Sequence, residues 1–207
     1  IATDKVDIGD NIILLDDTST AHINATTATV TVDETAGHQA DETTDSAVIA
    51  LFAGVASKGA DLSTPQYAVS ADALVSTTLS SFGADNEGAT KVLSLEINGG
   101  SGTDSGLHTT DGTSIWLFLE NGVVVGRIGD TSADAANGTA AFAVVIQQDG
   151  TVAVAQYVSL EHPDSTLPNE PVDLGGLINA VVTVTDGDKD IATDKVDIGD
   201  NIILLDD

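Results

Sequence analysis

NAVVTVTDGDKDIATDKVDIG, residues 179–199, is the stretch of sequence that decides the fold. Two runs of alternating apolar and polar residues flank the acidic sequence TDGDKD. Alternation with a period of two is typical of strands that bury one face, and a short polar loop joins such strands into a hairpin. The stretch therefore predicts a β-hairpin in which residues 181–185 pair with a strand over residues 195–198.

The same pattern recurs along the chain. SIWLFLENGVVVGRIG, residues 114–129, places two apolar runs around Asn121-Gly122, which is the strongest short signal for a hairpin. Residues 142–160 repeat this arrangement around Asp149-Gly150, whereas residues 45–62 are the least strand-like and leave room for one short helix. Short strands at regular spacing predict an all-β fold, an antiparallel β-sandwich that is Ig-like or an extended variant of it.

The hairpin ends in a duplicated sequence. IATDKVDIGDNIILLDD occupies residues 191–207 and also residues 1–17, so the copies begin 190 residues apart. Identity over this length indicates a tandem array of near-identical units. We expect residues 1–17 to be the C-terminal segment of a preceding unit plus linker, and residues 18–207 to be one unit that ends in the next linker. Because the first copy lacks its hairpin partner, residues 1–10 are expected to be looser or edge-paired.

Composition narrows the class of protein. Thirty-three acidic residues oppose six basic ones, for a formal net charge of −27. Such a charge opposes the compact state by self-repulsion, which divalent cations or a salt-rich medium would relieve. It is unsuited to nucleic acid and to anionic membranes, so we expect neither partner and no direct membrane insertion. The absence of cysteine excludes disulfides and thiolate metal sites, and the absence of methionine fits a fragment of a longer chain.

The densest carboxylate cluster lies in the loop of the deciding hairpin, at Asp186, Asp188 and Asp190. Three like charges at alternating positions repel each other unless a cation sits among them, and Ca2+ takes six to eight oxygen ligands. The loop is not an EF-hand, because its sixth position is Ile191 instead of Gly and its twelfth is Asp197 instead of Glu. The sequence predicts a calcium site here, and the alternative is a solvated hairpin tip.

A second acidic site is predicted where units join. A cation bridging the linker and neighbouring loops would stiffen adjacent units against each other, whereas the alternative is an ordinary polar linker. The candidate ligands are Asp16, Asp17, Asp33, Glu34, Asp206 and Asp207.

Motifs for catalysis are absent from the sequence. It contains no G-x-S-x-G, Walker or Rossmann fingerprint, and its four histidines show no metal-binding spacing, so we do not expect an enzyme. GGSGTDSGL, residues 99–107, nearly matches a calcium-binding nonapeptide, but a single such turn favours a plain turn loop. Trp116 lies in the most apolar run and is predicted to be core, with ligand stacking as the alternative.

The C-terminal part of the chain resembles a known family of repeats. AFAVVIQQDGTVAVAQYVSLEHPD (residues 141–164), NEPVDLGGLINAVVTVTDGDKD (169–190) and ATDKVDIGDNIILLDD (192–207) are similar to the T1SS-143-type extender repeat of giant RTX adhesins, which bacterial type I systems secrete. TVDET near the start fits the same pattern, and residues 40–110 resemble it weakly. The family's acidic loop typically carries Gly where this chain has Lys189.

This resemblance implies a function. It implies a structural extender repeat, made rigid by Ca2+ within and between repeats, that holds a distal adhesive domain away from the bacterial cell. It also implies a secreted or cell-surface location, neighbouring repeats of the same chain as partners, and otherwise a monomer. Two alternatives stay open: a module of such an adhesin that binds a glycan or a surface, and an acidic protein adapted to salt without calcium.

Overall fold

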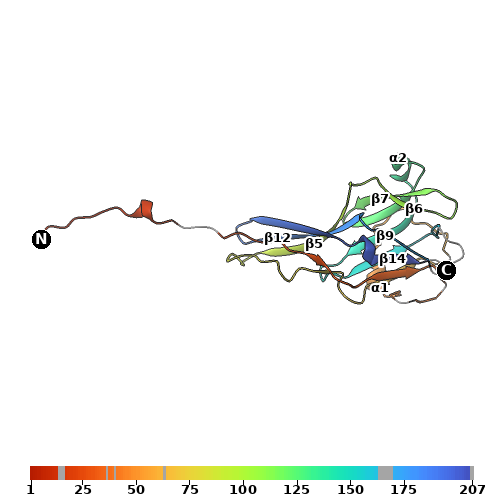
Figure 1. The fold of residues 1–207 in the computed structure, drawn as a ribbon, viewed down its shortest axis with the longest axis horizontal. Helices are drawn as coiled ribbons and strands as arrows, with labels where there is room; N and C mark the ends of the chain where they lie inside the picture. The colour runs from red at the N-terminus through yellow and green to blue at the C-terminus, as the bar shows by residue number, and fades with distance from the viewer. Residues whose placement is uncertain (14–16, 36, 40, 63, 163–169, 206–207) are drawn as a thin grey trace.

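The computed structural model describes residues 1–13, 17–35, 37–39, 41–62, 64–162 and 170–205. Their strands form a large sheet with two small sheets against it (Figure 1). The large sheet has the order β3 (Gln66–Val69), β10 (Val152–Gln156), β9 (Ala140–Ile146), β8 (Val123–Ile128), β7 (Ser114–Glu120) and β6 (Thr103–His108). The small sheets are β11 (Pro171–Asp173), β14 (Ile202–Leu205) and β2 (Val30–Asp33), and β13 (Ile191–Asp197), β12 (Ile178–Thr185) and β5 (Thr90–Ile97).

The remaining described elements are short. β1 (Asn24–Ala25) pairs with β4 (Val75–Ser76), and the helices are α1 (Ser46–Leu51) and α2 (Ser132–Ala135). Single 3-10 turns occur at η1 (Gly9–Asn11) and η2 (Gly199–Asn201). Within the described residues, neither helix is long and apolar enough to span a membrane. The predicted all-β, sandwich-like fold is confirmed.

The predicted hairpins are confirmed because their turn chemistry is local. β7 and β8 meet at Asn121 and Gly122, whose φ angles of 51° and 85° suit the type I′ turn that an Asn-Gly pair favours. β9 and β10 pair across the Asp149-Gly150 turn. β12 and β13 pair from Val181↔Lys195 to Thr185↔Ile191, so the strand expected over residues 195–198 begins earlier, at Ile191, and ends at Asp197.

Three predictions need correction. The fold is not purely antiparallel, because η2 leads β14 into the other small sheet, where it runs parallel to β2. Residues 99–107 are not a plain turn loop, since β6 begins at Thr103; Ser105 can face the core because its hydroxyl donates to the Ile115 carbonyl at 2.6 Å. Trp116 is half-buried instead of core, and its indole N–H donates to the Gly129 carbonyl at 2.9 Å.

The central strands β9 and β10 of the large sheet are buried on both faces. On one face, the main core joins the large sheet to the small sheets, with Val144 and Val154 fully buried. On the other face, small residues such as Ala143 and Ala153 leave room for α1, whose end places Phe52 against the sheet. Alternation along β9 and β10 thus sends successive side chains to the two faces, as a strand geometry requires.

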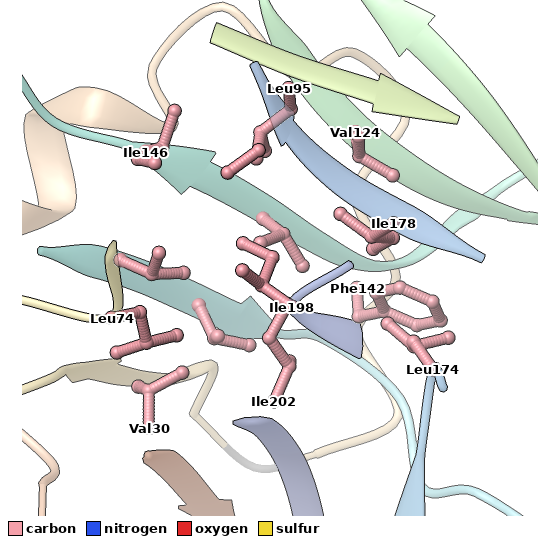
Figure 2. Close-up of a cluster of buried hydrophobic side chains, with 14 of the residues drawn as sticks. Val30, Leu74, Leu95, Val124, Phe142, Ile146, Leu174, Ile178, Ile198 and Ile202 are labelled. Carbon is pink, nitrogen blue, oxygen red and sulfur yellow. The ribbon is translucent and has the colours of Figure 1, made fainter. Parts of the chain in front are cut away.

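The second copy of the duplicated sequence completes the main core. We call residues 191–205 (β13, η2 and β14) the closing segment. It joins the two small sheets, because β13 pairs with β12 whereas β14 pairs with β11 and β2. Ile198, Ile202 and Leu204 have no exposed surface, and Figure 2 shows Ile198 and Ile202 in the middle of the cluster of buried side chains.

The first copy forms the same 3-10 turn without the burial. We call the described residues from Asp17 onward the body. The described part of the first copy, residues 1–13, runs away from the body as an extended segment that contains no strand (Figure 1). Gly9–Asn11 nevertheless forms the 3-10 turn of Gly199–Asn201, and in each copy the glycine N–H donates to the Asp two residues before it. The seventeen residues therefore encode the turn locally, while tertiary contacts decide the burial.

One carboxylate ties the closing segment to the start of the body. Oδ2 of Asp194 accepts a hydrogen bond from the backbone N–H of Ile23 at 3.0 Å and lies 3.4 Å from Nδ1 of His22. The N–H of Ile23, followed by that of Lys195, lowers the pKa of Asp194 because both stabilise the ionised form.

This lowered pKa predicts an acid-sensitive contribution to stability. A group with a lower pKa in the folded state stabilises it above the unfolded pKa, about 3.9 for Asp, and the contribution is lost as pH falls through the folded value. We expect Asp194→Asn to lower the free energy of unfolding at pH 7, and the gap from the parent to shrink toward pH 3 in urea titrations. Asp4→Asn, the same change in the exposed first copy, is the control and should show no gap at either pH. A gap for Asp194→Asn that does not depend on pH would contradict this assignment.

Candidate metal centre

The predicted calcium loop connects β12 to β13. Beyond the last strand pair, the backbone N–H of Asp186 donates to the Asp190 carbonyl at 3.1 Å, and the N–H of Asp190 donates to Oδ1 of Asp186 at 2.8 Å. Lys189 has a φ of 87°, a left-handed conformation that normally favours glycine. Lys189 thus adopts a strained backbone conformation at the position where the similar repeats carry Gly. The two hydrogen bonds between Asp186 and Asp190 close the loop tightly.

This closure brings the three predicted carboxylates together. Carboxylate oxygens of Asp186, Asp188 and Asp190 lie within 4.8 Å of one another. Asp186 is fully buried, whereas Asp188 and Asp190 are exposed at the rim. The three side chains lie together because alternating positions in a tight loop can turn to the same side. That this cluster binds calcium stays a prediction.

Asp186 offers a buried carboxylate oxygen to a ligand. Its Oδ2 is buried and receives no hydrogen bond from the described part of the chain, which is rare for a buried polar atom. Burial raises the pKa of Asp186, but contact with Asp188 and the backbone N–H groups of the loop lower it, and the net shift is downward. An ionised carboxylate in contact with a second one needs a cation or a shared proton, and a metal ion would supply the missing partner of Oδ2.

A second loop forms the other wall of the site. The N–H of Gly187 donates to the Asp85 carbonyl at 2.8 Å, so the acidic loop rests on residues 83–88. A Cβ at position 187 would lie 2.8 Å from the Glu87 carbonyl oxygen, which explains the glycine. Asp85 and Glu87 line an open hollow together with Asp188. Sequence reasoning missed these two acids, although the sequence GADNEG places them between glycines with positive φ.

The site lies where the chain enters the body. The Ser19 hydroxyl donates to the Asp190 carbonyl at 3.5 Å, and Oδ2 of Asp17 accepts from the N–H of Ala84 at 2.7 Å. Asp17, predicted as a junction ligand, therefore lies against residues 83–88, the same wall that supports the acidic loop. The end of the body that meets the first copy thus collects carboxylates from three separate parts of the sequence.

Two further predicted junction residues, Asp33 and Glu34, lie at the far end of the body, beside β14. Asp33 pairs in register with Leu205, and its Oδ1 accepts from the N–H of Thr35 at 2.8 Å. Oε1 of Glu34 accepts from the Leu160 N–H at 2.7 Å and from the Gln156 side chain at 2.6 Å, so this carboxylate helps to hold the fold. Within one unit the structure does not bring these two acids to Asp17. Asp16, Asp206 and Asp207 lie outside the described residues, so the inter-unit site stays a prediction.

The chemistry of the donor set suits a hard divalent cation. The loop offers carboxylate oxygens, one of them buried and unpartnered, and the neighbouring wall adds further acids and backbone carbonyls. Oxygen-only ligation is what Ca2+ prefers, and the exposed rim leaves room for water to complete six to eight ligands. The described residues here contribute no imidazole or thiolate, which softer metals favour.

Comparison with known proteins identifies a family without a known activity. A protein-family model described as "Domain of unknown function (DUF5801)" matches residues 29–199. No curated protein and no solved structure matches the chain. Because the match covers most of the sequence, including β2 and the whole acidic loop, the chain belongs to the DUF5801 family of domains.

Proposed function

We propose that this chain is a structural extender unit of a tandem array, made rigid by calcium, in a large secreted or cell-surface bacterial adhesin. The observation that carries the proposal is that two identical sequences have different structural environments. The second copy is integral to the core, whereas residues 1–13 of the first lie outside the body and contain the same local turn. The first copy is thus what the closing segment of a preceding unit would look like, seen without that unit.

The arrangement of the body supports an extended array. In Figure 1 the first copy joins the body at the end that bears the β12–β13 loop, and β14 runs toward the opposite end. By sequence equivalence, the residue that matches Leu205 in a preceding unit is residue 15, a few residues before Ser19. Successive bodies would therefore follow end to end with a short connection, which is the geometry of a spacer.

Calcium would couple the stiffness of the array to its environment. The acidic loop lies beside Ser19 and Asp17, so an ion bound there would sit at the seam with the preceding unit. A cation that binds the folded state and hardly the unfolded one stabilises by RT ln(1 + [L]/Kd), about 2.7 kcal/mol per site at a hundredfold excess over Kd. It would also neutralise part of the net charge of −27.

Thermal unfolding with calcium and with EDTA tests the proposal. For a domain of this size, about 2.7 kcal/mol raises Tm by roughly 5–11 °C, so we expect a rise of that order in calcium. Matched ionic strength in sodium chloride is the control, since a salt-adapted acidic protein would respond to salt alone. An unchanged Tm on adding calcium would contradict the proposal. Binding to a glycan array would favour the ligand-binding alternative if a substitution of Trp116 abolished it.

A further inference from the structure

We infer that the closing segment is interchangeable between units, so that residues 1–15 of one chain can occupy the position of residues 191–205 in a second copy of this chain. The receiving copy is one in which residues 191–205 have moved out of their native position. This interaction goes beyond the proposed extender function and does not require calcium.

The chemistry of the receiving position is specified by the native structure. In its native position the closing segment has Ile198 and Ile202 completely buried. Its strand β13 pairs with β12, and its strand β14 lies between β11 and β2. The first copy carries the same side chains in the same order, with Ile8 and Ile12 in place of these two isoleucines. It would make every contact of the closing segment, because the two sequences are identical.

The first copy is also prepared for this role. The large apolar side chains of residues 1–13 are exposed, with 57% of Ile8 and 61% of Ile12 accessible to solvent. Its turn is already formed, since Ile8 and Ile198 share ψ of 5° and Ile12 and Ile202 have ψ of 109° and 107°. Binding therefore gains apolar burial without having to create the turn, which lowers the entropic cost of ordering the segment.

Geometry excludes the same body as the recipient. If residue 15 took the place of Leu205, it would lie beside the N–H of Glu34, which donates to the Leu205 carbonyl at 3.2 Å. Ser19 lies at the start of β13, bonded to Asp190, and four peptide steps reach at most about 14 Å. β13 alone spans roughly 20 Å at the usual rise per residue, and β14 continues toward the other end (Figure 1). The recipient must be another unit.

An interaction between different surfaces of identical chains joins the molecules head to tail. Each chain would offer a first copy at one end and a receiving position in its body, which gives rings or open chains of molecules. In the intact protein the chain's own closing segment competes at a high effective concentration and keeps its place. A test must therefore disable that competitor and leave the first copy intact.

The test uses the full chain with Ile198→Asp and Ile202→Asp. A charge at these fully buried positions prevents the closing segment from seating. We expect this variant to assemble as its concentration rises, with at least a doubling of average mass in sedimentation equilibrium and recovery of β-sheet circular dichroism. The matched control adds Ile8→Asp and Ile12→Asp, which disables both copies and should abolish assembly. If the two variants show the same mass and spectrum at every concentration, the inference is overturned.

A crosslink reports whether the register is the native one. The parent chain has no cysteine, and Val181 pairs with Lys195, whose counterpart in the first copy is Lys5. In the Ile198→Asp, Ile202→Asp background, Lys5→Cys with Val181→Cys should give a ladder of disulfide-linked chains on a non-reducing gel. Lys5→Cys with Val182→Cys is the control, because residue 182 points to the opposite face. Equal ladders from both pairs, or none from the first, would contradict the exchange.

Discussion

Ile198→Ala is expected to lower the free energy of unfolding by about 2–5 kcal/mol, the range for removing a large aliphatic side chain from a close-packed core. Ile198 is fully buried at the centre of the main core (Figure 2), where the closing segment passes from one small sheet to the other. Ile8→Ala makes the same change in the same sequence, but Ile8 is exposed, so its effect should stay within about 0.5 kcal/mol. Urea denaturation of both variants at a fixed calcium concentration provides the measurement.

The neighbouring glycine shows the same asymmetry independently. A Cβ on Gly199 would lie 1.9 Å from the Leu174 carbonyl oxygen, whereas a Cβ on Gly9 would meet only the Asp7 side chain at 3.2 Å. Identical sequences are thus placed in opposite environments. Equal destabilisation by Ile8→Ala and Ile198→Ala would show that residues 1–13 are also part of a packed core, and our assignment of the unit would be wrong.

Asp186→Asn is expected to abolish the rise in Tm that calcium produces, a loss of roughly 5–11 °C if one site is removed at a hundredfold excess over Kd. Asp186 is the buried member of the cluster, and its unpartnered Oδ2 is the atom that a cation would engage. An amide keeps the size of the side chain and removes its charge. Tm measured in calcium and in EDTA separates loss of the ion from loss of packing, since only the former makes the two values converge.

Asp72→Asn provides the matched control for charge. Asp72 is exposed between β3 and β4, so the change removes one negative charge without altering the acidic loop. Its Tm should respond to calcium as the parent does. If both variants reduce the calcium response equally, the effect comes from overall charge and the loop is no specific site.

Local signals explain what could be predicted from the sequence. Asn121-Gly122 sets its hairpin through φ angles that few other pairs adopt, and the alternating aspartates of the acidic loop cluster because a tight loop lets them turn to the same side. Both features depend on residues that are close together in the chain. The 3-10 turn of the duplicated sequence is of the same kind, since it forms with and without tertiary contacts.

Features that depend on distant residues could not be read in this way. Nothing in the duplicated sequence tells a buried copy from an exposed one, because the difference lies in whether β12, β11 and β2 are present beside it. The parallel pairing of β14 with β2 joins residues near the start of the sequence to residues near its end, and Asp85 reaches the acidic loop across about a hundred residues of sequence. Sequence spacing carries no information about such contacts.

Calcium titration by isothermal calorimetry, with the parent chain and Asp186→Asn in parallel, tests the central claim most directly. We expect a saturable binding isotherm for the parent, and loss of at least one site in the variant, under conditions in which both remain folded. A parent chain that releases or absorbs no heat beyond dilution at several temperatures, or a variant that titrates as the parent does, would contradict a calcium centre in the β12–β13 loop.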